Sequence, residues 1–302
     1  MIRVLLAYPN GSVAGPHVAR ALRKVAEVRH VDLAPLPDEG VLRARLPLGR
    51  TARAAARKAN VKPDLFVQVD GPGSKHLRDP RALGCPTAFW AVESHRSEKR
   101  EFLRYVALSF DHVFVAQKDD VAAFRAPATK SHWLPLACDP DVHRDLGTPR
   151  EVDVAHVGGS PAGGPRAGPI QLLARTYKVE ARATASPAEA SALYSRSKVA
   201  FHRSLDGELD ARVFEAMACG ACLVTDRIRD LEGLFRDREH LVLYDEWDML
   251  DVVDETMADE EGRERIARAG QTLVRERHTY AHRVAELLRT LGYRQEADAV
   301  PP

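Results

Sequence analysis

The chain has 302 residues, with 44 Lys and Arg against 43 Asp and Glu, a formal net charge of +1 and 45% apolar residues. The near-zero charge excludes the strongly basic surface of a dedicated nucleic-acid binder, and the ordinary apolar content excludes a wholly disordered chain. No window approaches the roughly 18 consecutive apolar residues of a transmembrane helix. The length predicts about two domains.

The amino-terminal half has the pattern of a parallel α/β sheet, because short apolar runs alternate with helical stretches. After the first strand, Val18, Leu22, Val25 and Val28 recur at helical spacing and predict a helix with one apolar face. Strands are expected at 2–7, 28–33, 64–69, 87–92, 112–116 and 132–136.

A polar stretch with Gly and Pro at 145–151 interrupts this pattern, which then starts again. The second half predicts strands at 152–157, 177–181, 198–202, 222–225 and 241–244. Helices are expected at 187–195 and 212–218, with a long helical region over 247–291. The sequence therefore predicts two α/β units in tandem, with a hinge near residue 148.

The cysteines and the amino terminus together predict a cytoplasmic, reducing location. Four cysteines are too few for a secreted disulfide scaffold, and the apolar run before Pro9 predicts a first strand rather than a signal peptide. Cys219 and Cys222 form C-G-A-C at the end of a predicted helix, and thiols are activated at the opposite end. We therefore expect two buried packing residues rather than a redox pair.

Each half opens with a strand that leads into a glycine-containing loop. Gly11 lies in the first loop, and Gly158 and Gly159 lie in the second. Glycine lets backbone N–H groups approach a phosphate, so both loops are candidate ligand contacts, although either could be a surface connection. Neither loop matches G-x-G-x-x-G, and G-x-x-x-x-G-K-[ST] is absent. A dinucleotide dehydrogenase and a P-loop NTPase are therefore disfavoured.

Residues 198–226 predict a strand, a polar loop, a short helix, a glycine turn and a buried strand. His202, Arg203, Arg212 and Glu215 collect around the loop and the start of the helix. Arginine binds diphosphate oxygens bidentately, and a carboxylate one turn inside the helix can accept hydrogen bonds from the two hydroxyls of a ribose. From these residues alone, a nucleoside-diphosphate site and an Arg–Glu surface pair both remain open.

The segment R-V-F-E-A-M-A-C-G-A-C-L-V-T-D resembles the donor-binding segment of GT-B glycosyltransferases, especially the spore-maturation CgeB-like group. Similar segments lie at 89–95, 111–118, 133–143, 153–159, 198–204 and 240–244. The resemblance implies two Rossmann-like domains that face a cleft. It assigns the acceptor side to 1–148 and the nucleotide sugar to 149–302, with a helix over 280–291 that crosses back to the first domain.

The activity implied is transfer of a sugar from a nucleotide-diphosphate sugar to an acceptor hydroxyl, with no cofactor and no metal ion. The resemblance and the loops together give these donor-binding residues: Gly11, Gly158, Gly159, Arg166, His202, Arg203, Arg212 and, for the ribose, Glu215. Glu93 and His95 end a strand of the acceptor half and are candidates for a general base. The D-P-D string at 139–141 is expected to fix the local backbone rather than to bind a cation.

One departure from the family concerns the first glutamate of its E-x7-E arrangement. Counting back eight positions from Glu215 gives Gly207, and Glu208 is one residue away from the expected place. Glu208 could serve only if the loop is rearranged. The identity of the sugar and the stereochemical outcome therefore stay open.

The expected partners are the nucleotide sugar and an acceptor. The acceptor is a glycan, a lipid-linked molecule or a small molecule, and no nucleic acid is expected. Residues 41–62 hold seven basic residues and no acid, which predicts either a solvated helix face or a patch for peripheral membrane contact. Two other functions remain: a sugar-nucleotide epimerase of GT-B-like fold, and a non-catalytic module that binds nucleotides or glycans.

Overall fold

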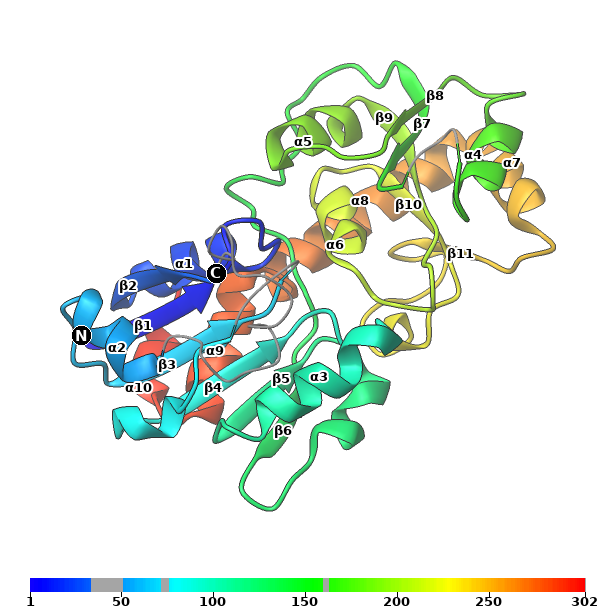
Figure 1. The fold of residues 1–302 in the computed structure, drawn as a ribbon. Coiled ribbons are helices and arrows are strands. Elements are labelled where there is room, and N and C mark those ends of the chain that lie inside the picture. Colours follow the sequence, from blue (N-terminus) through cyan, green and yellow to red (C-terminus); the bar gives the residue numbers. More distant parts are fainter. Residues whose placement is uncertain (34–50, 72–75, 160–162, 302) are drawn as a thin grey trace. The chain divides into compact units, whose positions relative to one another are not determined.

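The structure is a computed structural model that describes residues 1–33, 51–71, 76–159 and 163–301. The chain forms two compact units (Figure 1). The first unit comprises Met1–Leu136 together with Tyr280–Pro301, and the second comprises Ala137–Thr279. Both units are α/β structures built on one parallel sheet, as the sequence predicts.

The first unit has a six-stranded sheet in the order β2-β1-β3-β4-β5-β6, with every neighbouring pair parallel. Its strands are β1 (Ile2–Tyr8), β2 (Ala26–Asp32), β3 (Leu65–Val69), β4 (Thr87–Ala91), β5 (His112–Val115) and β6 (Lys130–Trp133). Its helices are α1 (Gly15–Arg23), α2 (Ala52–Lys58), α3 (Ser97–Ala107), α9 (Tyr280–Thr290) and α10 (Arg294–Ala299). Each of the six expected strands is present, although the last covers Lys130–Trp133 rather than 132–136. The expected apolar face of the first helix is wrong at Val25 and Val28, because α1 ends at Arg23. Val25 lies in the turn that follows, and Val28 lies in β2.

Helices cover both faces of this sheet. Helices α2 and α3 pack on one face, in a core that contains Phe66 and Phe89. Trp90 follows Phe89 in the same strand and therefore points to the opposite face. There its ring contacts Tyr280 of α9 edge-on, with 6.3 Å between the ring centroids. The first sheet is thus completed by a helix from the far end of the chain.

The second unit has a five-stranded parallel sheet in the order β11-β10-β9-β7-β8. Its strands are β7 (Val152–Val157), β8 (Val179–Arg182), β9 (Ser197–His202), β10 (Cys222–Asp226) and β11 (Val242–Tyr244). Its helices are α4 (Ala167–Leu173), α5 (Pro187–Ser195), α6 (Ala211–Ala218), α7 (Met249–Ala258) and α8 (Glu260–Arg277). One core cluster joins the sheet to α5 and α6, and a second joins it to α4 and α7. The helical region expected over 247–291 is divided into α7, α8 and α9.

The chain passes from the first unit to the second after Leu136, upstream of the hinge expected near residue 148. The reason is a set of hydrogen bonds that ties the intervening segment to α5. Ser191 Oγ donates to the carbonyl of Val142 (2.8 Å), and Ser195 Oγ donates to the carbonyl of Arg144 (3.0 Å). After Thr279 the chain returns to the first unit, so α9 and α10 belong there.

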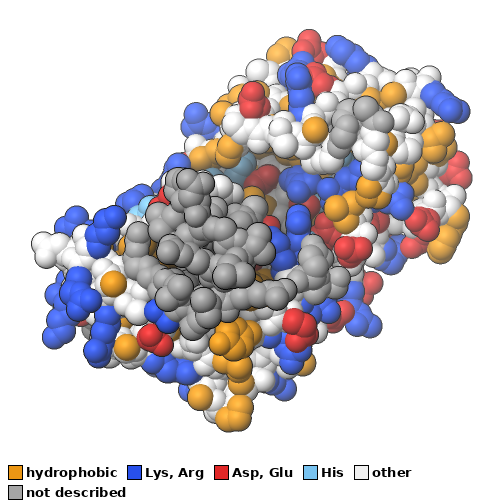
Figure 2. Space-filling model, in the orientation of Figure 1, with side chains coloured by type: hydrophobic (Ala, Val, Ile, Leu, Met, Phe, Trp, Pro, Cys, Tyr) orange, Lys and Arg blue, Asp and Glu red, His pale blue; other side chains and the backbone are white. Residues whose placement is uncertain are grey.

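Acidic and basic side chains are interspersed on the face of the second unit that Figure 2 shows, consistent with the balanced composition. Of the basic segment 41–62, Arg43, Arg45 and Arg50 lie outside the described residues. Within the described ranges, no helix is both long and apolar enough to span a bilayer.

Candidate functional site

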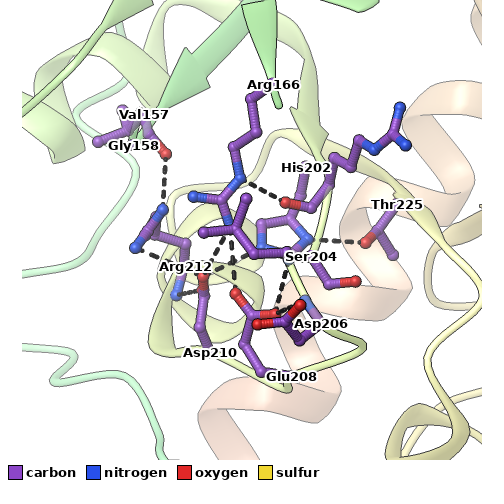
Figure 3. A network of polar contacts seen from close by, with 12 residues as sticks. Val157, Gly158, Arg166, His202, Ser204, Asp206, Glu208, Asp210, Arg212 and Thr225 are labelled. Atoms are coloured by element: carbon purple, nitrogen blue, oxygen red, sulfur yellow. Dashed lines mark hydrogen bonds and ion pairs between the residues drawn. The ribbon is translucent and has the colours of Figure 1, made fainter. Parts of the chain in front are cut away.

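The candidate site lies at the carboxyl ends of β7 and β9. The order of the strands reverses here, because β8 lies on one side of β7 whereas β9, β10 and β11 lie on the other. Ligands of open parallel sheets bind outside the strands at such a switch point. Gly158 and Gly159 follow β7, and His202 ends β9. Gly158 and His202 lie with Arg166 and Arg212 in the network of Figure 3. Gly159 lies next to the side chain of Arg166.

The glycine loop and Arg212 form the first part of the network. Gly158 and Gly159 have φ values of 109° and 82°, which a residue with a side chain rarely adopts. The guanidinium of Arg212 lies against Gly158, and its Nη1 donates to the carbonyl of Val157 (3.3 Å). The loop therefore needs glycine both for its conformation and for the approach of Arg212.

Arg166 and Glu208 form a buried ion pair, with Nη2 and Oε1 separated by 3.2 Å. Arg166 Nε also donates to the carbonyl of Arg203 (2.6 Å). The other oxygen of Glu208 accepts backbone N–H bonds from Leu205 (2.6 Å) and Asp206 (2.9 Å). Both oxygens of Glu208 are therefore used to hold this loop and its arginine.

Asp210, which was not predicted from the sequence, contacts the basic side chains of the site. Its Oδ1 accepts the backbone N–H of Arg212 (2.8 Å) as the N-cap of α6, and its Oδ2 lies 3.2 Å from His202 Nε2. Burial alone would raise the pKa of this carboxyl, but Arg212, His202 and Arg166 outweigh it and hold the pKa far below its usual range. The helix start expected to favour a diphosphate is thus already capped by a carboxylate. A local signal in the sequence could have identified Asp210, since an Asp directly before a helical pattern is a common N-cap.

The side chains of His202 and Arg203 contact other side chains of the second unit. The two ring nitrogens of His202 face Thr225 Oγ1 (2.9 Å) and Asp210, so the ring links β9, β10 and the start of α6. Arg203 pairs through Nη2 with Glu246 (2.7 Å). Its role as a direct phosphate ligand stays a prediction.

Glu215 lies one turn after Arg212 on α6. Burial, and next the charge of Asp210, raises the pKa of this carboxyl to about 7. The ring of His143 faces it, with 3.6 Å between Nε2 and Oε1. His143 was not predicted from the sequence, because no local pattern relates it to a helix so far along the chain.

The remaining predicted site residues belong to the first unit. Gly11 lies in an exposed turn after β1, with open space around it. Glu93 is buried just after β4, where its carboxylate accepts a hydrogen bond from Lys99 Nζ. His95 is half-buried nearby, and its carbonyl lies 3.5 Å from Arg100 Nη2. The structure therefore places Gly11, Glu93 and His95 in the first unit, whereas the other predicted donor-binding residues lie in the second.

Two further expectations concern cysteines and metal ions. Cys219 and Cys222 are buried free thiols, and burial raises the pKa of each to about 12, which confirms them as packing residues. In the D-P-D string, Asp139 Oδ1 accepts the backbone N–H of Asp141 (3.1 Å), so this carboxylate fixes a turn as expected. In the described part of the chain, no cluster of three or more His, Cys, Asp or Glu residues is arranged to hold a metal ion.

Comparison with known proteins gives one family match. Residues 148–289, which include Gly158, Arg212 and Glu215 but not His143, match a family described as "Glycosyl transferase-like". No curated protein matches the chain.

Solved structures match nearly the whole chain at low identity. HepE from Anabaena, solved in complex with UDP and glucose, is 15% identical with a TM-score of 0.63, and the match covers 97% of this chain and 100% of that one. Sucrose-phosphate synthase from Thermosynechococcus elongatus is 11% identical with a TM-score of 0.62, covering 99% and 100%. A glycosyltransferase from Rickettsia africae is 10% identical with a TM-score of 0.59, covering 97% and 98%. The chain therefore has the fold of the GT-B glycosyltransferases.

Proposed function

We propose that this protein is a glycosyltransferase that moves a sugar from a nucleotide-diphosphate sugar to an acceptor hydroxyl without a metal ion. The observation that carries the proposal is the placement of Arg212 against Gly158, with Glu215 one turn further on, at the switch point of the second sheet. The family match over residues 148–289 and the UDP and glucose in the HepE structure support it.

In this proposal the second unit binds the donor. Arg212 and the Gly158–Gly159 loop contact the diphosphate, and Arg166 supports them from its buried position. Preorganised cationic groups of this kind stabilise the charge that develops on a departing diphosphate. Glu215 accepts hydrogen bonds from the ribose hydroxyls. We also propose that the protein resembles the CgeB-like group in particular and that the sugar it transfers is a hexose.

The first unit provides the acceptor side. Glu93 and His95 are the candidates for a general base. Because Lys99 forms an ion pair with the Glu93 carboxylate, His95 is the stronger candidate for the general base. The acceptor is a glycan, a lipid-linked molecule or a small molecule, and the basic segment 41–62 is proposed to contact a membrane surface. We place the reaction in the cytoplasm, because the four cysteines are all free thiols.

A panel of nucleotide sugars, incubated with the protein with and without candidate acceptors, tests the function. Acceptor-dependent release of nucleoside diphosphate supports a glycosyltransferase. A changed sugar on an intact nucleotide would instead identify an epimerase, and binding without turnover would identify a binding module. Arg212→Ala should abolish release. The matched control is Arg236→Ala, because the Arg236 side chain is 77% exposed on the same unit, outside the network of Figure 3.

A further inference from the structure

The turn that opens the second unit presents a buried histidine to the carboxylate of Glu215. His143 ends this turn, and 1% of the residue is exposed. Its backbone N–H donates to the carbonyl of Asp139 (2.7 Å), and its ring Nδ1 accepts the backbone N–H of Asp139 (3.1 Å). The neighbouring carbonyl of Val142 is held by Ser191 of α5. The position and the orientation of the ring are therefore fixed from two sides.

These contacts also fix the tautomer. Because Nδ1 accepts a hydrogen bond from a backbone amide, it carries no proton, and the ring proton lies on Nε2. This Nε2–H faces Glu215 Oε1 at 3.6 Å, just beyond hydrogen-bond length. Among the described residues, no other side chain or backbone N–H donates to this carboxylate or forms an ion pair with it.

We propose that His143 is a positioning residue that holds one oxygen of the Glu215 carboxylate, so that the other oxygen meets the ribose hydroxyls of a nucleoside diphosphate. This inference rests on the proposed function and assigns a determinant of ribose recognition within it. A carboxylate in a buried site that lacks this donor is less stable as an anion and free to rotate, and both effects weaken its bonds to the two hydroxyls.

The charge state of Glu215 depends on every group around it. Asp210 raises its pKa and Arg212 lowers it. Among the residues that the structure describes, Tyr194, Cys219 and His143 are titratable groups that also face it. In this proposal the Nε2–H of His143 favours the charged carboxylate, so its removal should raise the pH at which ribose-dependent binding reaches half of its maximum.

The test measures binding of UDP, GDP, ADP and CDP, each compared with its 2′,3′-dideoxy counterpart, by calorimetry on the full chain. The variants are His143→Phe, which removes the Nε2–H donor, and His143→Gln, whose amide nitrogen takes its place. For the nucleotide that the wild type binds most tightly, His143→Phe should weaken the ribonucleotide about tenfold and leave the dideoxy form within about twofold. His143→Gln should restore most of the preference for ribose, and only His143→Phe should shift the pH midpoint upward.

The possible failures are distinguishable. If the wild type binds none of the four nucleotides and does not bind dTDP either, the proposed function is overturned. If the wild type binds one of them but His143→Phe keeps its preference for ribose, or loses ribonucleotide and dideoxynucleotide affinity equally, His143 does not position Glu215 and only this inference fails. Dideoxynucleotide affinity also reports whether the variant is folded, so a misfolded protein is not mistaken for a loss of ribose recognition.

Discussion

The guanidinium of Arg212 occupies the space that a side chain on Gly158 would need. A Cβ atom on Gly158 would lie 1.8 Å from Arg212 Nη1, far inside contact distance. The two residues come from different elements, the loop after β7 and the first turn of α6. The position of the arginine therefore depends on the absence of a single methyl group.

Gly158→Ala should displace Arg212 and weaken nucleoside diphosphate binding at least about tenfold, measured by calorimetry. Gly292→Ala is the matched control, because Gly292 also has a positive φ, 91°, but nothing lies within 4 Å of its Cβ position. Both variants should lose about 1 kcal/mol of unfolding free energy from backbone strain. Unchanged nucleotide affinity in Gly158→Ala would contradict a donor contact at Arg212.

Arg166 and Glu208 should show strong coupling in urea unfolding. Both side chains are buried, so Arg166→Met or Glu208→Gln alone should cost about 3–5 kcal/mol by leaving a buried charge without its partner. The double variant should cost less than the sum of the two by about 1–3 kcal/mol. The control is the exposed pair Arg268 and Glu264, whose coupling should stay below about 0.5 kcal/mol. Additive losses at the buried pair would show that Arg166 and Glu208 do not depend on each other.

Glu215→Gln should stabilise the protein at alkaline pH. The pKa of this carboxyl is about 7 in the folded chain against an ordinary value of 4.5. Below about pH 4.5 both states are protonated and the variant should match the wild type. As the pH rises to 7, the unfolded chain loses its proton first, so the wild type loses up to about 3 kcal/mol that the variant keeps.

Urea unfolding at pH 4, 6 and 8 measures this difference for Glu215→Gln. The exposed Glu276→Gln serves as the control and should show no such trend. The same Glu215→Gln protein should bind ribonucleotides more weakly. A variant that is no more stable than the wild type at pH 8 would mean that Glu215 is not buried as a costly carboxylate.

Cys219 and Cys222 should resist alkylation in the native protein. With both pKa values near 12, hardly any thiolate exists at pH 8, and both side chains are buried. Mass spectrometry after iodoacetamide treatment should find both unmodified until urea unfolds the chain. A native Cys219–Cys222 disulfide after mild oxidation would restore the redox interpretation.

Transfer activity should survive an excess of EDTA. The donor site proposed here uses Arg166, Arg212 and a glycine loop to balance the diphosphate charge. A chelator titration in the nucleotide-sugar assay measures this, with a magnesium-dependent transferase in parallel as the control. Activity that falls with chelator and returns with a divalent cation would contradict the metal-free mechanism.

Local patterns predicted the fold closely, because each depends on neighbours in the sequence. Strand β4 was found from its continuous apolar run, as expected of a strand buried on both faces. Helix α5 was predicted with its observed bounds, and Ser186 and Glu189 form a capping box at its start. The break between α7 and α8 was missed, although Asp259 caps α8 there and residues 259–265 hold no apolar side chain.

The candidate site was predictable only in part. Arg212 and Glu215 were found because they lie in one short helix whose pattern is recognisable. Their partners Glu208 and Asp210 lie next to them in the sequence, but their bonds depend on how the loop folds back on Arg166 and His202. His143 depends on a contact between distant segments, which no single sequence displays.

The return of the chain to the first unit at Tyr280 sets an order of events during synthesis. All six strands of the first sheet leave the ribosome before the second unit, but α9, which covers Trp90, leaves after it. A nascent first unit must therefore wait with part of one apolar face uncovered, beside α1, while the whole second unit emerges. Domains generally fold as they are made, in order from the amino terminus. Here the second unit can be complete before the first, and a protein truncated after residue 148 would be left with an unfinished core.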